Sequence, residues 1–247
     1  MKKWLLVLLG FILSIGVNSC TRELPDYTID EAFVLMNEAV SNYLNADSLS
    51  LEYTGNYVST NYNNDESMIV RMKKMNSENL IGYVYMDILE NETTFKSIVN
   101  YQQGMIYTER TQDGSTEYVK DTLAYTEYQS LYQSFLKKEI NQASTRSPQI
   151  LIDKDTLTVN FELASEKVEE TFFVSTVLNT VHYAIVSMVL SHDAKLLSFT
   201  VEYEATINQI LGTQTYSVSI LKLDQYVVIS QLSSSEIALY QQATTSE

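Results

Sequence analysis

The chain has one cysteine, two prolines and seven glycines in 247 residues, and its basic residues are few. A single cysteine excludes an internal disulfide framework and any zinc site built from cysteine pairs. Sixteen lysines and arginines stand against 31 aspartates and glutamates, which gives a formal net charge of −15. Because binding to DNA or RNA depends on cationic side chains that neutralise phosphates, this balance counts against a nucleic-acid partner. With so few prolines and glycines, no linker divides the chain into two domains.

The sequence signatures of catalysis and metal binding are also missing. The two histidines, His182 and His192, flank one predicted strand and would lie more than about 25 Å apart when it is extended. No Gly-x-Ser-x-Gly sequence or glycine-rich phosphate loop occurs. The calcium-like start at 153–155 lacks the loop glycine and the later glutamate. We therefore expect a protein that is not an enzyme and that holds no cofactor or metal.

The first twenty residues have the order of a bacterial lipoprotein signal. Two lysines precede an apolar run at 4–17, which is shorter than the about 20 residues that a spanning helix needs. Val17-Asn18-Ser19-Cys20 follows and resembles a lipobox, in which the cysteine is acylated and becomes the mature amino terminus. We expect residues 1–19 to be a signal peptide and residues 20–27 to be a lipidated terminus and tether, durably held in the bilayer by two or more acyl chains. The alternative is a free thiol at Cys20 beside an ordinary cleavage site.

The rest of the chain changes between helical and strand periodicity. Thr28 and Glu31 fit a capping box before apolar residues at helical spacing, which predicts a helix over 29–45. A period of two then predicts about six strands up to residue 121, in an antiparallel meander, because links this short cannot make parallel crossovers. Helical spacing returns over 123–138.

The second half of the chain repeats the strand pattern with one ambiguous stretch. Residues 141–148 have the composition of a loop, and residues 166–179 fit either a helix or a strand. A short helix capped by Ser234 is expected near the end. The further strands are expected within 157–161, 182–190, 196–207 and 213–229. An antiparallel sheet with amphipathic helices on one face buries both kinds of apolar surface, so the fold class is α+β.

Three stretches of the chain together resemble a known family. The lipobox, the capped helix with Glu31 to Ala39, and Ser48 to Tyr53 leading into a long meander are similar to LolA/LppX-like bacterial lipoproteins, above all to uncharacterised Gram-positive branches. The resemblance implies a single domain over 28–247 with a strongly curved antiparallel sheet, a half-barrel, whose concave face is covered by helices. It also implies non-catalytic binding of a hydrophobic or lipid-like ligand between sheet and helices, at the extracytoplasmic face of the cell membrane.

Methionines and tyrosines on the predicted strands are candidates for contact with such a ligand. Flexible methionine side chains suit variable acyl chains, and tyrosines can line a cavity mouth with the ring inside and the hydroxyl in water. The candidates are Met68, Met72, Met86, Met105, Tyr83 and Tyr85. The competing interpretation is that these side chains fill an ordinary core. In that case the protein would be an interaction module, held at the membrane surface by acylated Cys20, with no ligand cavity.

Overall fold

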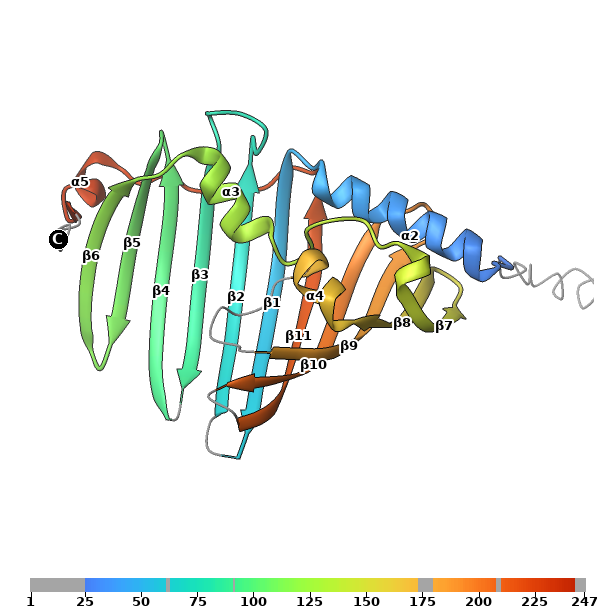
Figure 1. Ribbon diagram of the computed structural model, residues 1–247. Coiled ribbons are helices and arrows are strands. Elements are labelled where there is room, and N and C mark those ends of the chain that lie inside the picture. Colours follow the sequence, from blue (N-terminus) through green and yellow to red (C-terminus); the bar gives the residue numbers. More distant parts are fainter. Residues whose placement is uncertain (1–24, 61–62, 91, 173–179, 208–209, 243–247) are drawn as a thin grey trace, which may run out of the picture.

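The computed structural model describes residues 25–60, 63–90, 92–172, 180–207 and 210–242. Figure 1 shows how their helices and strands are arranged. The predicted signal peptide (1–19) and Cys20 lie outside the described residues, so both stay predictions. Within the described part of the chain, no helix combines the length and the apolar character needed to cross a bilayer.

One open sheet organises the molecule. Its spatial order is β12-β6-β5-β4-β3-β2-β1-β11-β10-β9-β8-β7, so two meanders meet where β1 pairs with β11. Every neighbouring pair is antiparallel except the short β12, which joins β6 in parallel. The strands are β1 (Ser48–Ser59), β2 (Asn63–Lys73), β3 (Ile81–Glu90), β4 (Thr93–Gln102), β5 (Met105–Gln112), β6 (Ser115–Thr122), β7 (Thr145–Ile152), β8 (Thr156–Ala164), β9 (Thr180–Ser191), β10 (Leu196–Ile207), β11 (Ile210–Leu223) and β12 (Gln241–Gln242).

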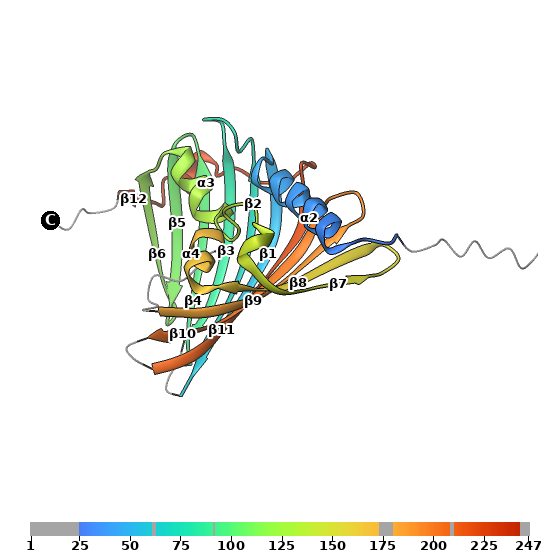
Figure 2. The same cartoon turned by 45° about the vertical axis from the view of Figure 1, so that its right-hand side comes forward.

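Three helices lie over one face of this sheet, which curves around them (Figures 1 and 2). They are α2 (Ile29–Leu44), α3 (Tyr125–Gln133) and α4 (Ser165–Thr171), and a short α5 (Ser234–Ile237) lies beyond β6. The amide of Thr28 donates to the carboxylate of Glu31 at 2.9 Å, and the amide of Glu31 donates back to the Thr28 hydroxyl at 3.3 Å. This capping box fixes the start of α2 as predicted. The expected α+β class, a curved sheet with helices on its concave face, is confirmed.

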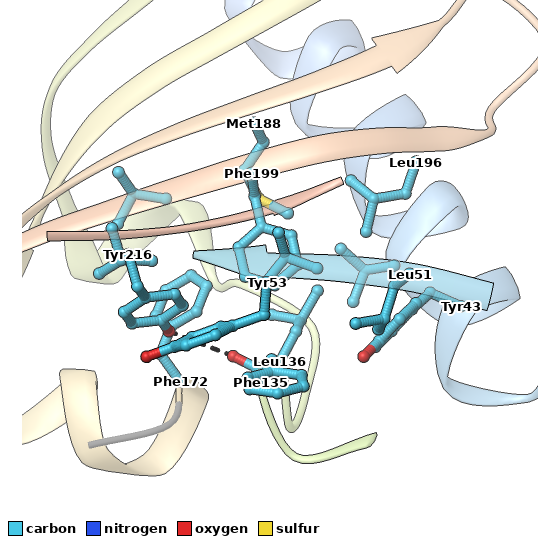
Figure 3. Packing of buried hydrophobic residues seen from close by; sticks show 14 of the residues in the cluster. Tyr43, Leu51, Tyr53, Phe135, Leu136, Phe172, Met188, Leu196, Phe199 and Tyr216 are labelled. Atoms are coloured by element: carbon cyan, nitrogen blue, oxygen red, sulfur yellow. Dashed lines mark hydrogen bonds between the residues drawn. The ribbon is translucent and has the colours of Figure 1, made fainter. Parts of the chain in front are cut away.

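The space between α2, α4 and the sheet is filled by large side chains (Figure 3). The ring of Tyr53 stacks on Phe135 with centroids 4.9 Å apart, and Phe199 meets Tyr216 edge-on at 6.3 Å. The Tyr216 hydroxyl donates to the carbonyl oxygen of Phe135 at 3.2 Å, and the Tyr43 hydroxyl donates to a backbone carbonyl at 3.0 Å. Complete burial raises the pKa of Tyr43 far above its usual value, so its phenol stays neutral. This part of the interior is a close-packed core.

The prediction of a loop at 141–148 is wrong from Thr145 onward, where strand β7 begins. A 3₁₀ turn occupies Gln142–Ser144, and the strand starts at Thr145. Pro148 has no amide to donate, but β7 is an edge strand, where such a residue is tolerated. Ser147 has a φ of 50° and the pairing slips between Arg146 and Gln149, so a bulge absorbs the irregular backbone. The prediction failed because loop-forming residues lie inside an edge strand.

Other element boundaries also differ from the predictions. Helix α3 ends at Gln133, short of residue 138, and Leu136 instead forms an isolated bridge with Phe172. The ambiguous segment 166–179 begins as helix α4, and its residues 173–179 lie outside the described part. Ser233 caps α5 in place of Ser234, because its hydroxyl accepts from the amide of Glu236.

The C-terminal residues 224–240, here named the strap, cross the convex face of the sheet. Strand β11 stops at Leu223, before the predicted end at 229. The strap then passes behind the upper ends of the first meander and reaches β6 (Figure 1). Val227 and Ile229 are buried along the way. The strap therefore covers part of a face that the helices leave open.

Candidate ligand-binding site

A groove of about 860 Å³ lies on the concave face of β3 to β6, beside α3. Its floor follows from strand register, because every second residue of a strand points to the same face. Met86 pairs with Ser97, and Ser97 pairs with Arg110, so these three form one row across the floor. Further lining side chains, all from these strands, are Ile88, Glu90, Phe95, Val99, Ile106, Thr108, Gln112, Ser115 and Glu117.

The apolar part of this floor is incompletely covered. Ile88, Phe95 and Ile106 are each half-buried, in contrast to the fully buried side chains under α2. Half-buried apolar side chains in a concave surface leave room for an apolar ligand. A volume of this size lies within the range of about 300–1,000 Å³ that holds small molecules in proteins.

Helix α3 forms one wall of the groove. The Tyr128 ring lies over Gly82 and stacks on Tyr101 with centroids 4.5 Å apart. Tyr132, one turn later, packs against Tyr128 at 4.9 Å and lines the groove. Burial raises the pKa of Tyr132 to about 12, although the Arg110 guanidinium acts in the opposite direction. The wall is thus a neutral aromatic surface.

Arg110 brings a positive charge to the groove. Its backbone pairs with Glu117 on β6, and its side chain is exposed. Within the described residues the guanidinium makes no hydrogen bond or ion pair. It is therefore available to a polar or anionic group of a ligand whose apolar part lies on the floor.

The structure brings together only some of the six residues that were predicted to contact a ligand. Met68 on β2 lies beside Met86 on β3, and Met86 lines the groove. Met72 shares their face but is fully buried in the core under the helices.

The other three candidates point to the convex face. Tyr83 and Tyr85 alternate with Met86 along β3, and Met105 alternates with Ile106 along β5. Tyr83 faces the strap, and the Tyr85 hydroxyl donates to Asp87 at 3.2 Å. These three side chains and those of the groove therefore lie on opposite faces of one sheet.

Sequence reasoning missed most of the groove floor. Alternation identifies which residues of one strand share a face, but only the pairing register shows that Phe95, Ile106 and Arg110 share the face of Met86. No cluster of three or more histidine, cysteine or acidic side chains that could hold a metal ion occurs among the residues that the structure describes.

Similarity to known proteins is confined to solved structures. No family model and no curated protein matches the chain. The chain is similar to LprF from Mycobacterium bovis, with 14% identity, coverage of 84% of this chain and 98% of that one, and a TM-score of 0.49. It is also similar to Rv2717c from M. tuberculosis (7% identity, 74% and 98% coverage, TM-score 0.26) and to the LolA superfamily protein NE2245 from Nitrosomonas europaea (8%, 80% and 94%, 0.22). At these identities the likeness concerns the fold alone.

Proposed function

We propose that this protein binds a hydrophobic or lipid-like ligand in the concave groove of β3 to β6, without catalysing a reaction. The observation that carries the proposal is the open, half-buried apolar floor beside an otherwise filled core. A ligand that covers Ile88, Phe95 and Ile106 removes apolar surface from water, which contributes about 25 cal/mol per Å². Arg110 shares the groove lining with the carboxylates of Glu90 and Glu117, so the rim favours a ligand with a polar head.

The proposal includes a membrane anchor on a single domain of residues 28–247. Acylated Cys20 would hold the protein at the extracytoplasmic face of the cell membrane. Tyr27 stacks on His192 with ring centroids 5.7 Å apart, which fixes the start of α2 to the turn after β9. Residues 21–26 then span at most about 20 Å. The tether would keep the β8–β9 end of the sheet near the bilayer, while the groove begins at β3, five strands from β9 and about 24 Å along the sheet at the usual strand spacing.

Photo-crosslinking in cells tests the binding site. Cells that express the full chain are fed a fatty acid with a diazirine in its tail, and crosslinked peptides are mapped by mass spectrometry. We expect adducts on the β3–β5 peptides, and at least tenfold fewer in Ser97→Phe, since the larger side chain fills the floor between Met86 and Arg110. The control Ser67→Phe places the same side chain on the exposed convex face of β2 and should leave the adducts unchanged. Equal labelling of both variants would contradict the proposed site.

Radiolabelling tests the anchor separately. The full chain should incorporate labelled palmitate and sediment with membranes, and Cys20→Ser should lose both properties. Palmitate in the Cys20→Ser protein would refute the lipidated cysteine without affecting the groove.

An interaction module at the membrane is the second candidate function. The filled core under α2 and α4 favours it, because the described side chains of that region are packed against one another. A protein partner that is crosslinked in cells and lost on surface substitution, together with unchanged behaviour of Ser97→Phe, would support this function over ligand binding.

A further inference from the structure

A second cleft, of about 480 Å³, lies on the convex face between β2–β6 and the strap. The register places Arg71, Tyr83 and Asn100 side by side on β2, β3 and β4, and all three line the cleft. Glu109 of β5 and Tyr240 of the strap contribute to its other walls. The cleft and the groove are thus separated by the thickness of the sheet.

The strap is fixed at two places around this cleft. Gln102 pairs with Leu232 as a strand would: its amide oxygen accepts from the backbone amide at 3.0 Å, and its amide nitrogen donates to the carbonyl at 3.4 Å. Tyr240 lies edge-on between Tyr107 and Tyr118, with centroid distances of 5.3 and 5.4 Å. The cleft is therefore preformed.

Asn100 is the unexplained residue of this cleft. It is only 8% exposed, and its side-chain amide makes no hydrogen bond with any residue that the structure describes. Gln102, two residues along the same face, has both of its amide atoms paired by the strap. The amide of Asn100 is open to water in the cleft, so a ligand can take the place of that water. A ligand in the cleft would supply the missing partner.

The lining of the cleft defines the chemistry of that ligand. The Arg71 guanidinium lies 5.8 Å above the centre of the Tyr83 ring. Burial, and after it the nearby carboxylate of Glu109, raises the pKa of Tyr240. The cleft thus combines one cation, the two carboxylates of Glu109 and Glu236, an amide without a protein partner, tyrosine rings and aliphatic side chains of the strap. The two carboxylates disfavour an anionic ligand, and the charged and amide groups beside the tyrosines disfavour a purely apolar acyl chain.

We propose that the cleft under the strap binds a neutral sugar unit. A sugar ring has C–H faces that pack on tyrosine and hydroxyl edges that both donate and accept hydrogen bonds. Those edges match the amide of Asn100, the guanidinium of Arg71 and the carboxylate of Glu109. This site is independent of the concave groove and of its proposed lipid-like ligand.

Saturation-transfer NMR and calorimetry on the full chain test this site. The protein is kept in a detergent without a sugar headgroup, and the probes are glucose, galactose, mannose, N-acetylglucosamine and their β-linked disaccharides. We expect at least one of these sugars to bind. Asn100→Leu should weaken that binding at least tenfold while the melting temperature stays equal or rises, because the unpaired amide is replaced by an apolar side chain of similar size.

A control variant and a second cleft variant separate loss of sugar binding from loss of folding. Asn160→Leu makes the same change on the same face at β8, away from the cleft, and should leave binding unchanged. Arg71→Gln alters an exposed side chain of the cleft and should weaken binding even if Asn100→Leu does not fold. Photo-crosslinking of the fatty acid to the groove should be the same in all three variants. No binding by any sugar, full binding by Asn100→Leu and Arg71→Gln, or binding of free amino acids instead would each overturn the proposal.

Discussion

Position 82 requires glycine, because the Tyr128 side chain of α3 occupies the space that a Cβ atom would fill. A Cβ built at position 82 would lie well under 3.0 Å from three atoms of the Tyr128 side chain. The Tyr128 ring cannot easily move aside, since it is fully buried between Tyr101 and Tyr132. The change Gly82→Ala therefore tests how α3, the wall of the groove, is seated on β3.

Two effects of opposite sign decide how much Gly82→Ala changes the free energy of unfolding. Alanine in a strand is more favourable than glycine by about 0.5–1 kcal/mol, because alanine loses less backbone conformational entropy than glycine when the chain folds. Overpacking a close-packed site costs about 1–3 kcal/mol. We expect the clash to dominate, so Gly82→Ala should lower the free energy of unfolding by about 1–2 kcal/mol in the wild-type chain. With Tyr128→Leu as the background, the clash is removed and the same change should be neutral or stabilising.

A double-mutant cycle measures this coupling. Urea unfolding of the four proteins, followed by circular dichroism, gives the interaction energy, for which we expect at least about 1 kcal/mol. Stabilisation by Gly82→Ala in the wild-type chain, or an equal cost in both backgrounds, would show that the contact of α3 with β3 differs from the one described.

Three further predictions concern the helix start, a surface carboxyl and the core. Thr28→Ala removes the cap of α2 and should cost about 1 kcal/mol in urea unfolding, with no loss if the cap contributes nothing. The Asp193 carboxyl accepts hydrogen bonds from Lys195 and a neighbouring hydroxyl, which lowers its pKa from 3.8 to about 2, so its stabilising contribution is present above pH 3.8 and is lost as the pH falls toward 2. An NMR titration of Asp193 should show this shift, and Lys195→Met should raise the pKa again. Phe199→Ala empties a fully buried position in the core and should cost about 3–5 kcal/mol, whereas a cost below 1 kcal/mol would contradict the packing in Figure 3.

The sequence predicted elements with regular periodicity well. The capping box and apolar stripe located α2 within a residue, and the short links of the first meander predicted its antiparallel pairing. Strand β7 was missed because an edge strand accepts Pro148 and a positive φ at Ser147, which a local pattern cannot distinguish from a loop. The strap was missed because its course depends on distant contacts such as that of Gln102 with Leu232.

The candidate site could be predicted only in part, for a geometric reason. Spacing shows that Met68 and Met72 share a face, but it says nothing of how the next strand is registered against them. Met105 was therefore grouped with Met86 although it points to the opposite face. Tyr83 was grouped with Met86 wrongly, because alternation along their shared strand already separates the two side chains. The strands were predictable one by one, and the site required their pairing.

Native mass spectrometry of the full chain, extracted from the cells that make it, shows whether the concave groove holds a ligand. We expect a non-covalently bound lipid-like mass, above that of the acylated chain, which collisional activation removes and which is absent in Ser97→Phe but retained in Ser67→Phe. A wild-type chain that carries no such mass under conditions that preserve the fold would contradict ligand binding in the concave groove.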